Sequence, residues 1–371
     1  MSHSSTAHPA ALMCKGWTVA EPASKWSKGV MSLTDVTMPP PGPTQVRIKV
    51  HAAGINPVDW KRTTFPASGA GPGVAGHGLK GYKGMHHKPP HYPYPYVVGV
   101  DGAGEVESVG TKVTGLKVGD RVMFHSSLLD SFAGSLCEYA VLEEAVVSPI
   151  PSDGPKPISF VEAAAIPCAT WTAYIALFDK LRIESGRSIF IDGASGGTGS
   201  SAVQLAHHAG LYVFASCSPS NTEYMKGLGA DVVLDYHEGS KMVDQILEAT
   251  EGYGVDYYLA VINTDDAEEY TDVLRFGGAV CLLSGVLTPT CDVLFRRQLS
   301  VHYVFLNGLH GHPMTWSQLR YVGDQVTELY QKNAFTLEVE VLPFTEAATA
   351  LDRCAAGKVG RGKLVVQVAS P

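Results

Sequence analysis

The spacing of apolar residues changes near residue 158, and this change predicts two architectures in one chain. Before that point apolar and polar positions alternate and the chain turns often, as β-structure does; TQVRIKVHAAGI (44–55) is typical of a strand. After it, short apolar strands alternate with helix-length segments. The expected strands are SIFIDGA (188–194), LYVFASC (211–217), DVVLDY (231–236), VDYYLAVI (255–262) and AVCLLSG (279–285). Such alternation predicts βαβ units and a parallel sheet with helices on both faces.

The chain length and the tail set the predicted domain boundaries. At about 150 residues per domain, 371 residues correspond to about two domains. Residues 337–368 have the pattern strand, helix, strand, and we expect them to rejoin the β-rich front part. We therefore predict one domain of residues 158–306 and a second, split domain of residues 1–157 and 307–371.

Composition and charge narrow the class of protein. Only 17% of the residues are charged, and 28 Lys and Arg against 36 Asp and Glu give a net charge of −8, which argues against a nucleic-acid partner. The seven cysteines are odd in number and none are spaced as CxxC, which favours a reducing compartment. The most apolar stretch (163–178) is too short to span a bilayer and is expected to be a buried helix. No apolar leader is apparent, so we expect a soluble, cytoplasmic protein without a membrane partner.

One long segment shows no periodic spacing of apolar residues. Residues 66–95 are rich in Gly, Pro, His and Tyr, and we expect a functional or mobile loop there. Four histidines (77, 86, 87 and 91) leave a metal site open as an alternative, but two of them are adjacent and no Cys or carboxylate lies among them. A solvated or lid-like loop that shapes substrate choice is favoured.

A glycine-rich turn follows the strand at 188–194. Residues 197–202 (GTGSSA) fit G-x-G-x-x-G/A, placed after a strand and at the start of a helix, which is the context of a dinucleotide-binding turn. Glycines let the backbone approach a pyrophosphate, and the helix N-terminus offers free N–H groups to that anion. The same stretch fits G-x-S-x-G (193–197), the nucleophile elbow of serine hydrolases, with Asp256 and His302 or His310 in the required order. This hydrolase alternative is less favoured because no HGGG-type oxyanion loop is present.

The end of the next strand bears on the choice of cofactor. An Asp or Glu normally stands there when the ribose carries a free 2′-hydroxyl, but this strand ends in Ser218-Pro219-Ser220-Asn221. Without a carboxylate to repel a 2′-phosphate, NADPH is favoured over NADH. No Arg or Lys lies in that turn, and Ser220 or Asn221 has the alternative role of a helix N-cap.

Taken together, these features resemble the medium-chain dehydrogenase/reductase superfamily. Its motifs stand in order along nearly the whole chain: AAGINPVDWKR (52–62), PYVVGVDGAGEVESVG (95–110), VGDRV (118–122), AAAIPCATWTAY (163–174), GASGGTGSSAVQLA (193–206), LGADVVLDY (228–236) and GKVGRGKLVV (357–366). The resemblance implies an α/β fold, in which a Rossmann doubly wound parallel sheet is combined with a β-rich GroES-like domain.

The superfamily contains zinc-dependent alcohol dehydrogenases and zinc-independent branches. Zinc alcohol dehydrogenases carry G-I-C-G-x-D in the first motif and G-H-E in the second; here Asn56 replaces the Cys ligand and Val100 the His ligand. Cys168 falls where the third ligand would be, but one thiolate cannot hold a catalytic zinc, which needs three protein ligands. The lobe with four closely spaced cysteines is also missing. We expect no zinc, with Cys168 a buried apolar thiol.

The remaining pattern resembles the zinc-independent quinone oxidoreductase branch, and Ser-Pro-x-Asn at 218–221 is similar to fungal trans-acting enoyl reductases. The resemblance implies that Asn56 and Asp59 lie near the nicotinamide as catalytic residues, although Asp59 has the alternative role of a local cap or an ion pair with Arg62. Tyr236 falls on the family's phosphate-binding Tyr. The full expected cofactor-binding set is Asn56, Thr170, Ser195, Gly196, Gly197, Thr198, Gly199, Ser218, Pro219, Ser220, Asn221, Tyr236, Asn263, Leu283 and Ser284, the last three at the carboxyl edge of the sheet.

The chemistry implied is direct hydride transfer from NADPH, without zinc, to a small-molecule quinone or α,β-unsaturated carbonyl. Tyr174, Thr170 and Lys61 lie near the expected cleft, but no general acid is assigned. Two alternatives stay open: a trans-acting enoyl reductase on a carrier-bound acyl or polyketide chain, and a non-catalytic nucleotide-binding protein. We expect a monomer or a homodimer, the latter formed through an edge strand near VHYVFLNG (301–308).

Overall fold

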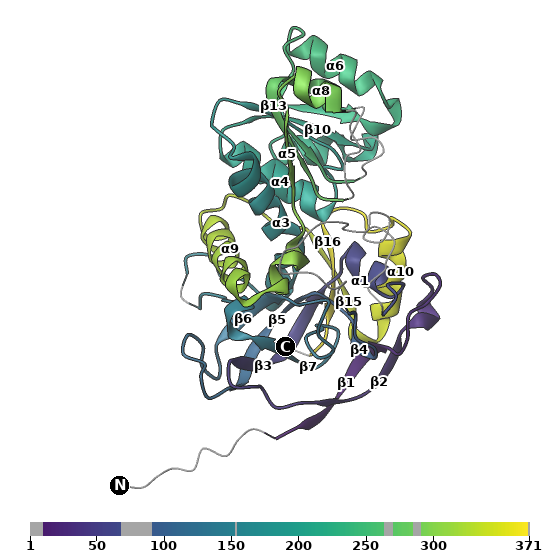
Figure 1. Cartoon of the computed structure of the whole chain (residues 1–371), viewed down its shortest axis with the longest axis vertical. Coiled ribbons are helices and arrows are strands. Elements are labelled where there is room, and N and C mark those ends of the chain that lie inside the picture. The colour runs from purple at the N-terminus through teal and green to yellow at the C-terminus, as the bar shows by residue number, and fades with distance from the viewer. Residues whose placement is uncertain (1–9, 68–90, 153, 263–269, 285–290, 370–371) are drawn as a thin grey trace.

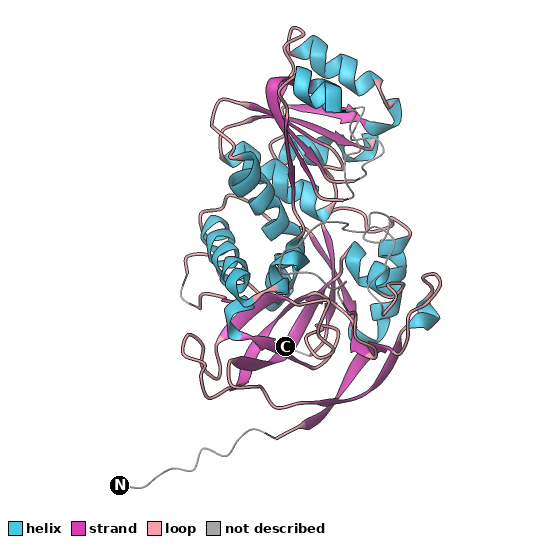
Figure 2. Cartoon of the chain, viewed as in Figure 1, coloured by secondary structure: helices cyan, strands magenta, loops and turns pink. Residues whose placement is uncertain are grey.

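Two bodies, one at each end of the molecule, correspond to the two halves of the apolar pattern (Figures 1 and 2). The structure is a computed structural model that describes residues 10–67, 91–152, 154–262, 270–284 and 291–369. Most of the expected loop, including His77, His86 and His87, lies outside the described residues. Within the described ranges, no helix is both long enough and apolar enough to cross a membrane.

The upper body in Figure 1 is built on a six-stranded parallel sheet with the order β11-β10-β9-β12-β13-β14. This order is that of a doubly wound Rossmann sheet and confirms the predicted fold class. The strands are β9 (Ser188–Ile191), β10 (Tyr212–Cys217), β11 (Val232–Asp235), β12 (Val255–Ala260), β13 (Leu274–Leu282) and β14 (Ser300–Tyr303). The helices are α4 (Gly197–His208), α5 (Thr222–Gly227), α6 (Lys241–Ala249) and α8 (Cys291–Arg296).

Strand β13 begins five residues before the predicted start at 279. Leu274 pairs with Val255, but the register then shifts, so that Ala279 pairs with Tyr257. Gly277 lies in the irregular stretch with φ +72°, a left-handed conformation that favours glycine. Gly277 and Gly278 interrupt the run of apolar residues, so the sequence pattern did not predict the first part of this strand.

The lower body contains the β-rich sheets. The larger one has the order β15-β16-β3-β5-β6-β8, with β7 paired to β3, and a smaller one has the order β2-β1-β4. The strands are β1 (Leu12–Val19), β2 (Ser32–Met38), β3 (Gln45–Gly54), β4 (Tyr96–Val97), β5 (Asp101–Val109), β6 (Arg121–His125), β7 (Tyr139–Glu143), β8 (Val147–Pro149), β15 (Val339–Pro343) and β16 (Lys363–Gln367). Helix α1 (Pro57–Arg62) follows β3 directly.

A continuous helical segment over residues 160–181 joins the two bodies. It comprises α2 (Phe160–Ala165), a π-helical turn (Pro167–Trp171), α3 (Thr172–Tyr174) and a second π-helical turn (Ile175–Leu181). Ser159 caps its start: the Ser159 Oγ accepts from Glu162 N at 3.2 Å, and the Glu162 carboxylate accepts from Ser159 N at 2.9 Å. Buried Thr170 bonds Ser201 of α4 at 3.0 Å between hydroxyl oxygens, so the segment is tied to the helix after the glycine turn.

The chain then returns to the β-rich body. After β14 it forms a short 3₁₀ segment (Leu306–Gly311), α9 (Pro313–Gln331), β15, α10 (Ala347–Ala355) and β16, which pairs antiparallel with β3. The predicted tail of strand, helix and strand is thus present and joins the front of the chain. The exact domain boundaries at 157/158 and 306/307 stay a prediction.

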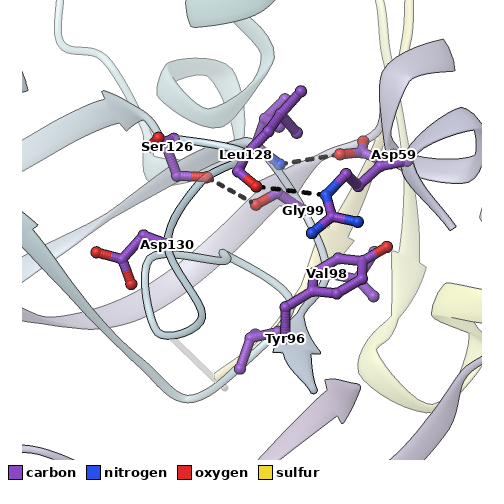
Figure 3. Close-up of a pocket in the computed structure, with 11 residues that line it drawn as sticks. Asp59, Tyr96, Val98, Gly99, Ser126, Leu128 and Asp130 are labelled. Carbon is purple, nitrogen blue, oxygen red and sulfur yellow. Dashed lines mark hydrogen bonds between the residues drawn. The ribbon is translucent and has the colours of Figure 1, made fainter. Parts of the chain in front are cut away.

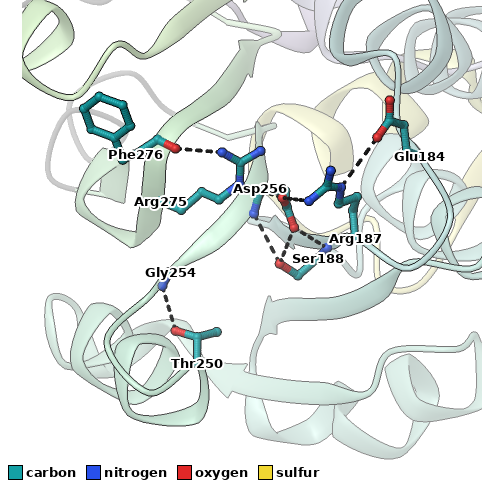
Figure 4. Close-up of polar contacts among 8 residues, drawn as sticks. All are labelled: Glu184, Arg187, Ser188, Thr250, Gly254, Asp256, Arg275 and Phe276. Atoms are coloured by element: carbon teal, nitrogen blue, oxygen red, sulfur yellow. Dashed lines mark hydrogen bonds and ion pairs between the residues drawn. The ribbon is translucent and has the colours of Figure 1, made fainter.

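A buried carboxylate joins three strands at the amino end of the Rossmann sheet (Figure 4). Asp256 of β12 is 7% exposed and accepts from Ser188 N of β9 at 2.9 Å and from Arg275 Nε of β13 at 2.6 Å. Arg187 Nη1 approaches it at 3.4 Å. These contacts fix the ends of three neighbouring strands with one side chain.

Asp256→Ala should lower the free energy of unfolding by about 2–4 kcal/mol, because it leaves Arg275 and the Ser188 N–H without their buried acceptor. The control is Asp272→Ala, whose carboxylate pairs with Arg297 at 2.9 Å but is 66% exposed; it should cost about 0–1 kcal/mol. Urea denaturation of both variants measures the difference. Equal losses for the two would contradict the role given to Asp256.

Candidate active site

The glycine turn after β9 has the geometry of an anion-binding helix start. Gly193 has φ +55°, and a Cβ at this position would collide with Ile262, while a Cβ at Gly199 would collide with the Gly193 carbonyl. Gly196 stands at the N-cap of α4 without a side-chain cap, and a Cβ there would meet nothing closer than 3.6 Å. The first N–H groups of α4 therefore have no acceptor within the helix, which suits them to a phosphate.

Two adjoining cavities lie between the bodies. The first, of about 460 Å³, is lined on the Rossmann side by residues 195–198, Cys217 and Tyr236 and on the other side by Asn56 and Lys363, among others. The second, of about 430 Å³, shares four lining residues with it: Pro57, Thr198, Val261 and Ile262. The cleft lies outside the carboxyl ends of the parallel strands, where ligands bind in such sheets.

Most of the predicted cofactor-binding residues meet at this cleft. Asn56, Ser195, Gly196, Gly197, Thr198 and Tyr236 line the first cavity, and Leu283 and Ser284 line the second. Thr170 is fully buried and Gly199 packs inside the turn, so both lie behind the lining. Asn263 lies outside the described residues.

The turn at 218–221 is joined to a cation from the far end of the chain. Arg361 donates from Nε to Asn221 Oδ1 at 3.1 Å and from Nη2 to the Ser220 carbonyl at 3.1 Å. The Ser218 and Ser220 hydroxyls lie 3.0 Å apart on the same turn. Nearby, Gly362 forms an isolated bridge with Gly196 of the glycine turn. Sequence reasoning missed Arg361, because 140 residues separate it from the turn that it contacts.

A buried polar network forms the floor of the cleft. Lys363 Nζ donates to Asn56 Oδ1 at 2.5 Å and to the Ile55 carbonyl at 3.0 Å, and it lies 3.6 Å from the Asp101 carboxylate. Asn56 Nδ2 donates to the same carboxylate at 2.8 Å. Burial raises the pKa of Asp101 to about 6, and the Lys363 ammonium opposes that rise. Asn56 is thus held in one orientation at the cavity wall.

Asp59 lies beneath this wall. Its carboxylate accepts from Asn56 N at 2.8 Å and from Val100 N at 2.9 Å, and burial raises its pKa to about 7. It lines a void of about 10 Å³, with room for about one water molecule, and it does not line the cleft (Figure 3). The geometry is that of the local cap. No Asp59–Arg62 ion pair is found among the described residues; Arg62 instead donates to Tyr94 and the Pro93 and Leu128 carbonyls.

Three potential metal ligands gather at one corner of the second cavity. Atoms of Asp101, His125 and Cys168 lie within 4.8 Å of one another. Both Asp101 oxygens already accept hydrogen bonds, from Cys168 N at 2.9 Å and from Asn56 Nδ2, and the Lys363 ammonium supplies positive charge beside them. Burial raises the pKa of the Cys168 thiol, which opposes the thiolate form that binds zinc. The donor set therefore fits a hydrogen-bonded network better than a zinc site.

The hydrolase alternative is wrong. Ser195 follows the carboxyl end of β9, whereas Asp256 binds Arg275 and Ser188 at the amino ends of the strands (Figure 4). His310 is hydrogen-bonded to His125 in the other body. The Ser, His and Asp of that reading are thus not assembled into a triad.

Comparisons with known proteins agree with this geometry. Residues 42–152 match the family model "Alcohol dehydrogenase GroES-like domain", and residues 197–321 match "Zinc-binding dehydrogenase". A solved alcohol dehydrogenase superfamily protein from Novosphingobium aromaticivorans has the same fold, with a TM-score of 0.81 and 23% identity; the match covers 96% of this chain and 100% of that one.

Curated relatives are more similar in sequence. A 2-methylene-furan-3-one reductase from Solanum lycopersicum is 36% identical over 69% of this chain, and the match spans only 59% of the tomato protein. A quinone oxidoreductase from Mus musculus is 32% identical, with 67% of each chain covered. The trans-enoyl reductase tazE from Aspergillus terreus is 32% identical over 72% of this chain and 78% of its own. The chain belongs to the medium-chain dehydrogenase/reductase superfamily and is quinone oxidoreductase-like.

Proposed function

We propose that this protein is an NADPH-dependent reductase that acts without zinc on a quinone or an α,β-unsaturated carbonyl compound. The observation that carries the proposal is the cleft: a glycine-rich helix start suited to an anion lines one cavity, and a second cavity of about 430 Å³ adjoins it. A bound nicotinamide would supply the hydride. The chain's own residues would hold cofactor and acceptor side by side and exclude water.

The residues suited to the cofactor form three groups. Residues 197 and 198, at the start of α4, present backbone N–H groups for the pyrophosphate. Ser218, Ser220 and Asn221, with Tyr236 and the guanidinium of Arg361, surround the expected place of the 2′-phosphate. Asn56, held by Lys363 and Asp101, is at the cavity wall, where we expect the nicotinamide amide group.

The donor atoms support the proposal of zinc independence. Asn56 and Val100 stand where this superfamily's Cys and His ligands would be, and a neutral amide held by Lys363 and an apolar side chain are not zinc ligands. Asp59 and Asp101 then have structural roles, orienting Asn56 and the Val100 backbone.

A carrier-bound acyl or polyketide substrate is the second candidate. Its support is the similarity to the trans-enoyl reductase tazE and the presence of the second cavity outside the cofactor cavity. A non-catalytic nucleotide-binding role is the third.

Strand β14 stands at the edge of the Rossmann sheet, as dimerisation through that strand would require.

An assay of NADPH oxidation with different electron acceptors separates these candidates. Purified protein should oxidise NADPH with quinones or enones, and metal analysis should find less than stoichiometric zinc, with activity unchanged by a zinc chelator. Turnover with acyl-thioesters alone would select the second candidate, and NADPH binding without any turnover would select the third. Activity that is lost to the chelator and restored by zinc would contradict zinc independence.

Gly196→Asp should weaken NADPH binding by about 100-fold or more, because a carboxylate about 4 Å from a pyrophosphate costs about 4 kcal/mol. Since a Cβ fits at Gly196, the melting temperature should change by no more than about 3 °C. Gly29→Asp, at an exposed glycine with open space around it, is the matched control. Titration calorimetry measures the affinity; unchanged binding would refute the placement of the pyrophosphate.

Arg361→Ala should raise KM for NADPH about tenfold or more and leave KM for NADH within about twofold, because only NADPH carries the phosphate that the guanidinium would bind. The control is Arg353→Ala, which removes an arginine of the same C-terminal region that pairs with Glu340 at 2.6 Å. Steady-state kinetics with both cofactors gives the comparison. An equal rise for NADPH and NADH would show that Arg361 only supports the turn.

A further inference from the structure

Two buried histidines from distant parts of the chain are hydrogen-bonded to each other. His125 ends β6, His310 lies in the 3₁₀ segment after β14, and His125 Nδ1 is 3.0 Å from His310 Nε2. Their side chains are nearly enclosed, at 2% and 9% exposure, and their rings are stacked with centroids 5.3 Å apart. Neither residue was singled out as a partner of the other by the sequence patterns.

The pair connects two separate cavities. His125 lines the 430 Å³ cavity of the cleft, as Cys168 and Leu283 also do. His310 lines a different cavity of about 220 Å³, whose wall includes Asp130, Glu143 and the partly exposed Leu129. The two cavities share no lining residue, so the imidazoles form a hydrogen-bonded connection between them.

Neighbouring hydrogen bonds fix the backbone segments that carry the two histidines. The Ser126 hydroxyl, next in the chain to His125, donates to the Gly99 carbonyl at 3.0 Å (Figure 3). Asn307 Oδ1 accepts from Leu128 N at 2.9 Å and so attaches the His310 segment to the loop after β6. Trp316 Nε1 donates to the His310 carbonyl at 3.0 Å.

Both imidazoles are suited to pass a proton rather than to keep one. Burial lowers the pKa of His310 to about 4 and the pKa of His125 well below its usual range, so both rings are neutral near pH 7. A neutral imidazole has one N–H and one bare nitrogen. In the single bond between the rings, one nitrogen therefore donates and the other accepts.

We propose that His125 is the proton donor to the reduced substrate and that His310 resupplies it from the second cavity. This inference rests on the proposed reductase function and names the general acid that the reaction needs. Hydride adds to the β-carbon of an enone, and the electron pair of the C=C bond moves onto the enolate. The Nε2 proton of His125 then forms the new C–H bond at the α-carbon.

The relay balances without a further reagent. As His125 gives up its Nε2 proton, its Nδ1 takes the proton of His310 Nε2, and His310 Nδ1 takes one from water in the 220 Å³ cavity. The substrate gains one hydride from NADPH and one proton from solvent. When product leaves, His125 Nε2 takes a proton from water in the cleft and the pair returns one through His310 Nδ1, which restores the starting tautomers.

The test uses two acceptors that differ in where the proton goes. Protonation of an enolate carbon is slow and needs a placed acid, whereas a hydroquinone oxygen is protonated rapidly by water. In His310→Gln, the amide can still donate a hydrogen bond to His125 Nδ1 but cannot pass on a proton. We expect kcat with 2-cyclohexen-1-one to fall about 10- to 100-fold, and to fall much further than kcat with 1,4-benzoquinone.

The matched control is His51→Gln, which replaces a largely buried histidine of the same body that lines neither cavity and stacks on Phe160 at 4.4 Å between ring centroids. It should leave the ratio of the two kcat values unchanged. An equal fall for both acceptors in His310→Gln, or no fall for the enone, would overturn the relay while the reductase function stands. Wild-type protein that reduces neither acceptor would overturn both proposals.

A measurement on the unaltered protein keeps the relay testable if His310→Gln does not fold. The enone rate is followed in mixtures of H₂O and D₂O. A relay moves more than one proton in the same step, so the rate should fall along a curve with the deuterium fraction. A linear dependence, which indicates a single proton in flight, would overturn the relay.

Discussion

The contact on which the cleft depends is the buried ammonium of Lys363 against Asn56 and Asp101. It brings together the last strand of the chain, the start of α1 and the start of β5, and the Asp101 carboxylate also accepts from Cys168 N in the connecting helical segment. An unpaired charge at this depth would be costly, so each of these groups needs the others. The floor of the cleft is therefore complete only when the C-terminal strand has returned to β3.

Local patterns were sufficient to predict most of the Rossmann body. The predicted strands that became β9, β10 and β12 are runs of residues that are largely buried on both faces, and the glycine turn is encoded within seven residues whose close contacts exclude a Cβ at Gly193 and Gly199. The exception, the early start of β13, depends on a register shift that places Gly277 within a strand. Local propensity cannot reveal such a shift, because its cause is the pairing partner.

The parts of the site that sequence reasoning missed are all made by long-range contacts. Arg361 reaches the 218–221 turn across 140 residues, Lys363 reaches Asn56 across 307, and His310 reaches His125 across 185. Each is a single polar residue in an unremarkable local context, and its meaning comes only from what the topology places beside it. Asp59 illustrates the converse: its motif predicts a place near the nicotinamide, whereas its carboxylate accepts from two backbone N–H groups and does not line either cavity of the cleft.

The buried charges also explain why a metal-free site would require a separate source of protons. A metal dication would stabilise the negative charge that hydride addition leaves on an acceptor, but here the buried cation at the floor of the cleft, Lys363, is already hydrogen-bonded to Asn56 and Ile55 and lies beside Asp101. Its charge is thus used to hold the floor together. In the described wall of the second cavity, His125 is hydrogen-bonded to His310, which lines the 220 Å³ cavity. Under the proposed relay, negative charge on the product would be removed by protonation instead of being balanced by a metal.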